Sequence, residues 1–244
     1  MDVATTLLEH ILDKKLPIGV GVHFLMVLLA LVLISSAFLW SFRKPTLKPK
    51  GLTLALEILV LFVRDDLVYP IMGSRQGQRW LPFFTTLFLL IAVLNFLGLV
   101  PIFKAATGNL SVTSALALMV FVLIFGVGWI RLGPKGFLKN LYPEGSPLGI
   151  GLFVAFLELV GLVTKSAVLS LRLFANMFAG HLAILSFLVL MMIVHPAFLA
   201  VSLPFAVFTY LLEVLISLIQ ALVFTLLSCL FIHMASASHE LSSE

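Results

Sequence analysis

The chain has 244 residues, of which 61% are hydrophobic and only 11% are charged, and it carries a net charge of +4. Soluble domains average about 45–50% apolar and about 25% charged residues, so this composition excludes a soluble globular protein, a disordered chain and a nucleic-acid-binding protein. The single cysteine, Cys229, excludes a disulfide framework and a cysteine-based zinc site. We therefore expect an all-α integral membrane protein whose residues 1–244 form one membrane domain.

Five segments are long and apolar enough to cross a lipid bilayer, which takes about 20 apolar residues. They are residues 18–40, 81–103, 110–131, 148–194 and 197–237. The first segment is too long for the apolar part of a signal peptide, and basic residues follow it. We therefore expect it to be a retained membrane helix.

Two stretches between these segments are assigned other structures. The apolar run within residues 50–66 is too short to cross and carries Glu57, which favours a helix lying in the membrane interface. Residues 73–79 are mostly polar and are predicted to be a connector. Gly133 and Pro134 predict a break after the third crossing segment.

The last two crossing segments are about twice as long as a bilayer requires. Residues 148–194 contain no proline and would form roughly 70 Å of helix at 1.5 Å per residue. Such lengths indicate either two broken helices or two long helices that are strongly tilted in the membrane. We predict the second arrangement, a long tilted hairpin that turns at His195 and Pro196.

The basic residues predict the orientation in the membrane. Residues 41–80 contain seven basic side chains and residues 131–149 contain three, whereas the N-terminal tail contains two and the loop after residue 103 only Lys104. Because basic loops stay in the cytoplasm, residues 41–80 and 131–149 are expected on the cytoplasmic side. The N-terminus is then outside, and five crossings place the C-terminus in the cytoplasm.

Ionisable and amide side chains gather in the predicted hairpin, although charge within a bilayer is costly and therefore marks functional positions. They are Glu158, Lys165, Arg172, Asn176, His181, Glu213 and Gln220. Snorkelling from a helix end is an alternative explanation for Glu158 and Lys165. It does not explain Arg172, which lies near the middle of its segment.

Helical spacing predicts how these residues face one another. Glu158, Lys165 and Arg172 are seven residues apart and share one helix face, which Asn176 joins, whereas His181 points the opposite way. Folding the hairpin about Pro196 places Arg172 opposite Gln220. The same folding places His181 within one turn of Glu213.

Three motifs resemble one known family. The stretch Ser170-Leu-Arg-Leu-Phe-Ala-Asn-Met-Phe-Ala-Gly-His181 resembles the signature of subunit a of the F-type ATP synthase membrane sector. The stretch Asn95-Phe-Leu-Gly-Leu-Val-Pro101 is similar to a motif in an earlier span of that family, and the segment from Gln220 to Met234-Ala-Ser resembles its last helix. Part of the family has an acid at the position of His181 and a histidine at that of Glu213, so this chain has the two exchanged.

The resemblance implies a proton-channel subunit, without cofactor or metal, that works against a rotating ring of c subunits. It implies two offset half-channels, one open to each side of a bacterial inner membrane. The implied partners are the c-ring, the b-subunit stator stalk, the rest of the ATP synthase and the lipid bilayer. Protons are favoured over sodium because His181 and Glu213 form a titratable pair.

The resemblance also implies a role for each polar residue. Arg172, which stays charged at any relevant pH, would make an approaching ring carboxyl release its proton and would block leakage between the half-channels. Asn176 and Gln220 would hydrogen-bond near the guanidinium. The outer half-channel would be lined by His181 and Glu213, with Asn95 either contributing or only joining two helices. Glu158 would line the inner one, and Lys165 would balance it or have no further role.

Two other classes of membrane protein compete with this interpretation. A secondary transporter could bind an anionic substrate at Arg172, but it would favour two repeated halves and broken mid-membrane helices, and the sequence has neither. A structural subunit of another complex leaves Arg172, Asn176 and Gln220 unexplained. The sequence has no P-loop motif, so we expect no ATPase activity in this chain itself.

Overall fold

The structure is a computed structural model that describes residues 21–43, 50–100, 103, 105–141, 148–193 and 199–237. The elements in these ranges are helices: α2 (Val22–Ser41), α3 (Leu52–Phe62), the π-helix η1 (Val63–Val68), α4 (Tyr69–Leu99), the 3-10 turn η2 (Ala106–Gly108), α5 (Leu110–Leu141), α6 (Leu148–Ile193) and α7 (Leu199–Ala237). Within the described ranges, five helical stretches are long and apolar enough to cross a membrane. The predicted all-α integral membrane protein is thereby confirmed.

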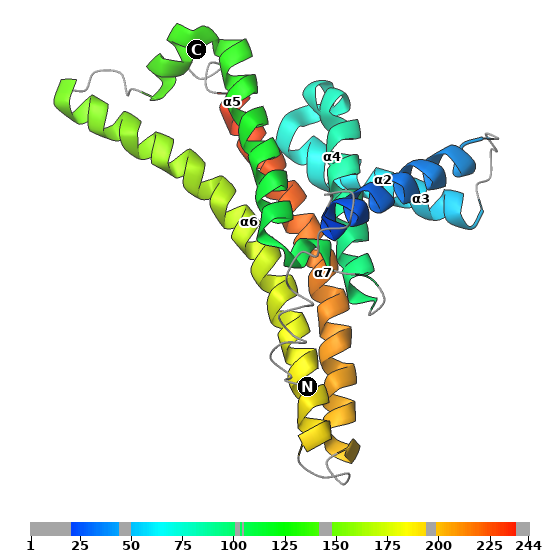
Figure 1. The fold of residues 1–244 in the computed structure, drawn as a ribbon. Helices are drawn as coiled ribbons and strands as arrows, with labels where there is room; N and C mark the ends of the chain where they lie inside the picture. The colour runs from blue at the N-terminus through cyan, green and yellow to red at the C-terminus, as the bar shows by residue number, and fades with distance from the viewer. Residues whose placement is uncertain are drawn as a thin grey trace.

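The longest helices, α6 and α7, form a hairpin: the later part of α6 runs beside the first part of α7, whereas the start of α6 diverges from α7 (Figure 1). Helix α6 is continuous over 46 residues, and α7 covers 39 residues with Pro204 inside it. At 1.5 Å per residue they are roughly 70 Å and 60 Å long, about twice the apolar thickness of a bilayer. The structure thus has the long helices rather than broken ones, although the predicted turn at His195 and Pro196 lies outside the described residues.

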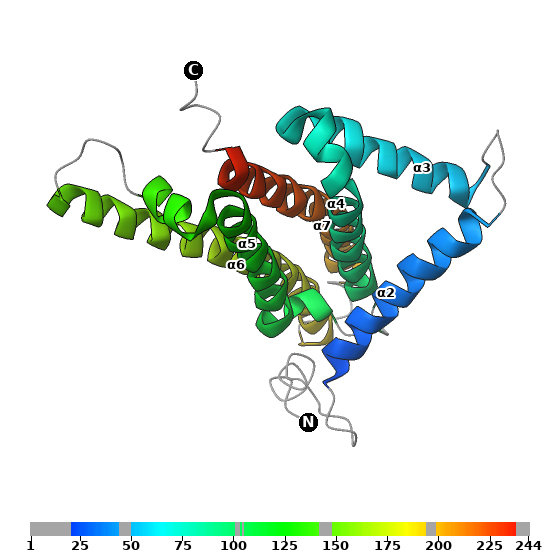
Figure 2. The same cartoon turned by 90° about the horizontal axis from the view of Figure 1, so that it is seen from above.

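The remaining helices pack around the middle of this hairpin. Helix α5 lies against α6, α4 lies against α7, and α2 and α3 form a second hairpin that projects to one side (Figures 1 and 2). The hydroxyl of Ser41 in α2 donates to Thr53 Oγ1 in α3 at 2.7 Å and joins the two helices of this hairpin. The consequence is that α4 occupies the centre, in contact with α7 on one side and α2 on the other.

The predicted polar connector at residues 73–79 is wrong, because these residues belong to α4. Only Gly73 leaves the helical conformation, with a φ of 70° that favours glycine. A side chain at Gly77 would press on the ring of Tyr69, so the segment after the kink folds closely against the residues before it. Polar side chains here are compatible with a helix since most of them are exposed.

Two helix ends also differ from the predicted boundaries. Helix α4 ends at Leu99 rather than at residue 103, because Val100 precedes a proline and takes an extended conformation. Helix α5 continues past residue 131 to Leu141, and the expected break survives as a kink at Gly133, whose φ is 68°. Its start is capped by the Asn109 side chain, which accepts a hydrogen bond from the Ser111 amide at 2.8 Å.

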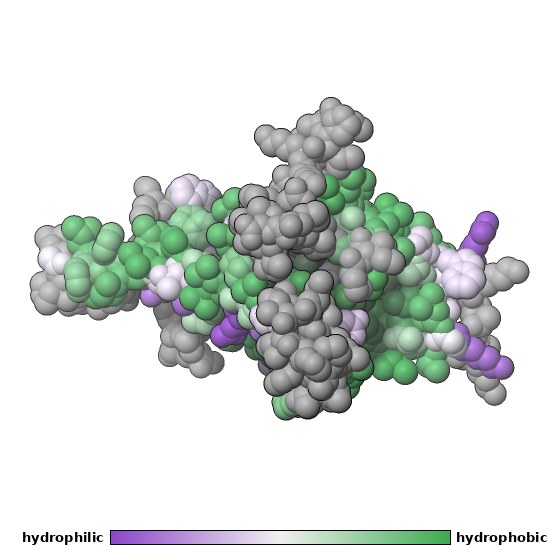
Figure 3. All heavy atoms as spheres, turned by 60° about the horizontal axis from the view of Figure 1, so that its bottom comes forward, coloured by the Kyte–Doolittle hydropathy of each residue, from purple (hydrophilic) through white to green (hydrophobic). Residues whose placement is uncertain are grey.

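Packing inside the molecule is centred on α4. Its fully buried side chains share one core cluster with those of α5, α6 and α7; the largest are Phe84, Leu87, Ile91 and Leu94 of α4, Ile124 of α5, Leu173 of α6, and Phe224 and Ile232 of α7. On the face that Figure 3 shows, the described residues are mostly hydrophobic, with a few hydrophilic ones between them. Such a surface suits a protein that is solvated by lipid rather than water.

Candidate functional site

A small polar cavity lies where α4, α6 and α7 meet. It is lined by Asn95 of α4, by Leu173, Asn176 and Met177 of α6, and by Glu213, Ile216, Ser217 and Gln220 of α7. Its space for water is about 10 Å³, close to the minimum that one water molecule needs. The structure therefore brings together four of the residues singled out in the sequence: Asn95, Asn176, Glu213 and Gln220.

Amide groups hold the three helices together around this cavity. Asn95 Nδ2 donates to the backbone carbonyl of Ser217 at 3.1 Å, and Asn176 Nδ2 donates to Gln220 Oε1 at 3.4 Å. The Asn95 Oδ1 and Gln220 Nε2 atoms are buried and have no hydrogen-bond partner among the described residues. Because buried polar atoms are costly without a partner, these two atoms are suited to hydrogen-bond with water, Asn95 Oδ1 as acceptor and Gln220 Nε2 as donor.

Glu213 is buried at the edge of the same cavity, with only 5% of its surface exposed. Neither carboxyl oxygen has a hydrogen-bond partner among the described residues. A Cβ atom at Gly180 of α6 would overlap this carboxyl group, so Glu213 occupies the space that a side chain at position 180 would take. The sequence analysis missed Gly180, although its place directly before His181 in the motif was a usable signal.

His181 is half-buried and follows Gly180, so Glu213 lies against the residue next to His181. This agrees with the level at which the folded hairpin was expected to place them. A working pair of His181 and Glu213 stays a prediction.

Arg172 lies outside the cavity, exposed on α6. The exposed side chains around its level on α6 and α7 are apolar; they include Val168, Leu171, Leu215, Leu218 and Ile219. No hydrogen bond or ion pair from a described residue reaches the guanidinium, and the hydrogen bond to Gln220 comes from Asn176, one turn further along α6. A permanent charge on such an apolar surface calls for a partner from another molecule.

Glu158 and Lys165 lie on the opposite side of Arg172 from the cavity. Lys165 Nζ is 3.9 Å from Glu158 Oε1 and 5.6 Å from the centre of the Phe231 ring in α7. Glu158 precedes Arg172 by 14 residues, which is about 21 Å of helix, whereas Gly180 follows Arg172 by about 12 Å. Two carboxyl groups thus flank the arginine along the hairpin, one exposed and one buried.

No group of three or more His, Cys, Asp or Glu side chains that could hold a metal occurs in the part of the chain that the structure describes. The polar groups described here are one guanidinium, one ammonium, two carboxyls, an imidazole and three amides. These groups can carry, release or repel a proton, but they include no activated nucleophile.

Comparisons with known proteins converge on one family. The family model described as ATP synthase A chain matches residues 23–233. ATP synthase subunit a of Myxococcus xanthus (strain DK1622) is 43% identical over 231 residues, which is 93% of this chain and 76% of that protein. Subunit a 2 of Chlorobaculum tepidum is 38% identical, over 94% of this chain and 67% of that protein. Subunit a of Chlorobium phaeobacteroides (strain DSM 266) is 40% identical, over 88% and 64%.

Proposed function

This chain belongs to the family of ATP synthase subunit a, and from that premise we propose that it is the proton-channel subunit of the membrane sector of an F-type ATP synthase. It is a multi-pass membrane protein with five helices that can cross the bilayer. It does not catalyse ATP synthesis itself; it supplies the path by which protons drive the enzyme.

One observation carries the proposal most strongly. Arg172 is exposed on an apolar face of the hairpin and receives no ion pair from the described residues of its own chain. In a membrane, this arrangement is favourable only when an anionic group from another molecule approaches the guanidinium. A ring of c subunits, each carrying one carboxyl group at the same depth, supplies such anions in succession.

The geometry supports a cycle of proton release and uptake at this arginine. A ring carboxyl stays neutral while it faces lipid, because the charged form is costly there. Near Arg172 the charged form is stabilised, so the carboxyl releases its proton. The permanent charge of Arg172 also repels protons, and it separates the two access routes.

The two routes are assigned to the two sides of the arginine. The cavity with Glu213, His181, Asn95, Asn176 and Gln220 forms the outer half-channel. Glu158 lines the inner half-channel, and Lys165 holds its carboxylate in place. Because the two routes end at different positions along the hairpin, a proton crosses only when the ring carries it from one to the other.

The proposed setting follows from the same assignment. The exposed apolar face of α6 and α7 lies against the c-ring, and the b-subunit stator stalk holds this chain fixed while the ring turns. The membrane is a bacterial inner membrane, with the N-terminus outside and the C-terminus in the cytoplasm.

Replacing Arg172 by alanine tests the proposal. The variant is expected to lose ATP-driven proton pumping and ATP synthesis in membrane vesicles while the complex still assembles. Arg172→Lys should also fail or be weak, since an ammonium lacks the planar, always-charged guanidinium. Leu39→Ala is the control, because Leu39 is an exposed apolar residue of α2 outside the face of α6 and α7, and it should pump normally.

The same vesicles separate this function from the competing ones. Full coupled activity of Arg172→Ala would refute the proposal. A transporter that binds its substrate at Arg172 would instead show uptake of an organic anion that the alanine variant loses, with pumping unaffected.

A further inference from the structure

We infer that Met177 forms the narrow apolar part of the outer proton route, between the α4–α5 connection and the cavity of Glu213, and that Gly98 sets its position. This inference rests on the proposed function and deepens it by naming the residue that limits proton access. Neither residue carries a charge, so the composition of the site gives no hint of this role.

The first observation is the position of the Met177 side chain, which is only 3% exposed. On one side it lines the cavity together with Asn95 and Glu213. On the other side it reaches the end of α4, where a Cβ atom at Gly98 would overlap the Met177 Cε atom and lie 3.1 Å from the Ala105 Cβ atom. A methionine side chain therefore fills the space between the cavity and the connection that joins α4 to α5.

The second observation is that polar atoms lie on both sides of this methionine. In the connection, the Thr107 hydroxyl is fully buried and its oxygen has no hydrogen-bond partner among the described residues. In the cavity, Asn95 Oδ1 and both carboxyl oxygens of Glu213 are also buried and have no hydrogen-bond partner among the described residues. Polar groups on either side of an apolar constriction are the arrangement by which pores admit water intermittently.

Methionine suits this position because it is unbranched, with three rotatable bonds that let the side chain adapt to its surroundings. The cavity has room for about one water molecule, so a movement of one methyl group changes whether water connects the two sides. Gly98 matters because it leaves the space that the methyl group of Met177 occupies when it is drawn back from the cavity.

The test is proton flux through assembled complexes in vesicles that carry a Gly98→Ala change. The added methyl group should push Met177 toward the cavity and lower the flux about tenfold, the effect of a barrier change of roughly 1.4 kcal/mol. Shortening the methionine in the double variant Gly98→Ala with Met177→Ala should restore the flux, because the overlap is then gone. Gly126→Ala, where a Cβ atom meets nothing within 4 Å, is the control and should behave as the unmodified protein.

A pH profile distinguishes a constriction from a general packing defect. If Gly98→Ala slows proton access from the outer side, raising the outer proton concentration should increase the flux over a wider pH range than in the unmodified protein. The dependence of the flux on the inner pH should be the same in both proteins. Met177→Phe enlarges the side chain at position 177 instead of at position 98 and fills the same space, so it should show the same pH profile.

Normal flux in Gly98→Ala, or no recovery in the double variant, would overturn the inference. An equal change in both pH profiles would overturn it as well. These failures leave the proposed function standing as long as Arg172→Ala abolishes coupled pumping, whereas a fully active Arg172→Ala variant removes the proposed function whatever Gly98 does.

Discussion

At the residue scale, a missing side chain is as informative as the charged ones. Glu213 is the buried carboxyl of the hairpin, and its carboxyl group lies where the side chain of residue 180 would otherwise be. Gly180 thus determines whether α6 and α7 can pass each other with a carboxyl group between them. Charged residues provide the chemistry here, but glycine provides the room for it.

We predict that Gly180→Ala disturbs proton flux through displacement of Glu213. The new Cβ atom overlaps the carboxyl group, so Glu213 must leave its place at the cavity, and the flux per assembled complex should fall about tenfold if this adds roughly 1.4 kcal/mol to the barrier. Gly161→Ala is the matched control on the same helix, because no atom lies within 4 Å of its added Cβ atom. Equal flux in the two variants would show that the position of Glu213 is unimportant.

A second prediction concerns the exchange of His181 and Glu213. Changing one partner alone leaves two like groups, two carboxyls in His181→Glu or two imidazoles in Glu213→His, which cannot pair as an acid with a base, so proton transfer should slow in each single variant. The exchange His181→Glu with Glu213→His keeps the same two groups at the same level of the hairpin. We expect the double variant to pump faster than either His181→Glu or Glu213→His alone.

Passive proton conductance and ATP-driven pumping at equal amounts of complex provide the measurement for this exchange. A double variant no better than the worse single variant would mean that the two residues do not act as a unit. The outer route would then have to be sought elsewhere than at Glu213.

At the element scale, the register of the helices is the testable quantity. The hydroxyl of Ser170 in α6 donates to Thr113 Oγ1 in α5 at 3.2 Å, and both side chains are buried. We predict that Thr113→Cys with Ser170→Cys forms a disulfide in a Cys229→Ala background, since these two side-chain atoms already lie close together. Thr113→Cys with Leu171→Cys should not cross-link, because Leu171 is exposed on α6. The two outcomes reversed would show that α6 is rotated from the orientation described.

Helix lengths were predictable because they depend on local sequence, whereas the connector was not. An unbroken apolar run without proline gave α6 its length, and the seven-residue spacing placed Glu158 and Lys165 on one face, where they now lie 3.9 Å apart. The polarity of residues 73–79 predicts a connector because polar stretches favour loops in soluble proteins. In the structure they stay helical, since most of their side chains are exposed.

The cavity shows the same division between local and tertiary information. Asn95, Asn176, Glu213 and Gln220 could be chosen from the sequence because polar residues in apolar segments are conspicuous. The space-filling roles of Gly98, Met177 and Gly180 could not be predicted, because such a role depends on which helix passes on the other side, although Gly180 directly precedes His181 in the motif. Only the packing of α4, α6 and α7 against one another reveals them.

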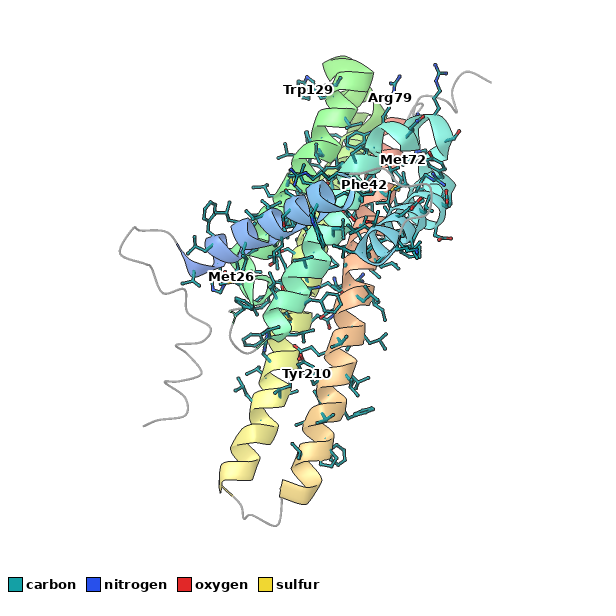
Figure 4. All side chains as sticks on the ribbon, turned by 90° about the vertical axis from the view of Figure 1, so that its right-hand side faces the viewer. Met26, Phe42, Met72, Arg79, Trp129 and Tyr210 are labelled. Atoms are coloured by element: carbon teal, nitrogen blue, oxygen red, sulfur yellow. The ribbon has the colours of Figure 1, made fainter. Side chains whose placement is uncertain are left out.

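At the scale of the whole molecule, the helices separate the two proposed access routes. The cavity of Glu213 adjoins the α4–α5 connection through Met177, whereas Glu158 lies in the first part of α6, which starts where α5 ends along the chain. Arg79 and Trp129 lie at the same end of the molecule, and Tyr210 of α7 lies far from them (Figure 4). An arginine and an exposed tryptophan at one level are typical of a membrane interface.

The orientation of the whole molecule follows from this arrangement and gives the last prediction. Ten basic residues lie in residues 41–80 and 131–149, and only three lie in the N-terminal tail and the loop after residue 103. The end with Arg79 is therefore expected in the cytoplasm. In a Cys229→Ala background, Arg79→Cys should react with a membrane-impermeant thiol reagent only from the cytoplasmic side. Ser111→Cys, exposed at the start of α5 just after the connection from α4, should react only from the outside. Leu94→Cys, fully buried in α4, is the control and should react from neither side until the protein is denatured. Labelling of Arg79→Cys from the outside would mean that the molecule has the opposite orientation in the membrane. Glu213 would then serve the inner route and Glu158 the outer one.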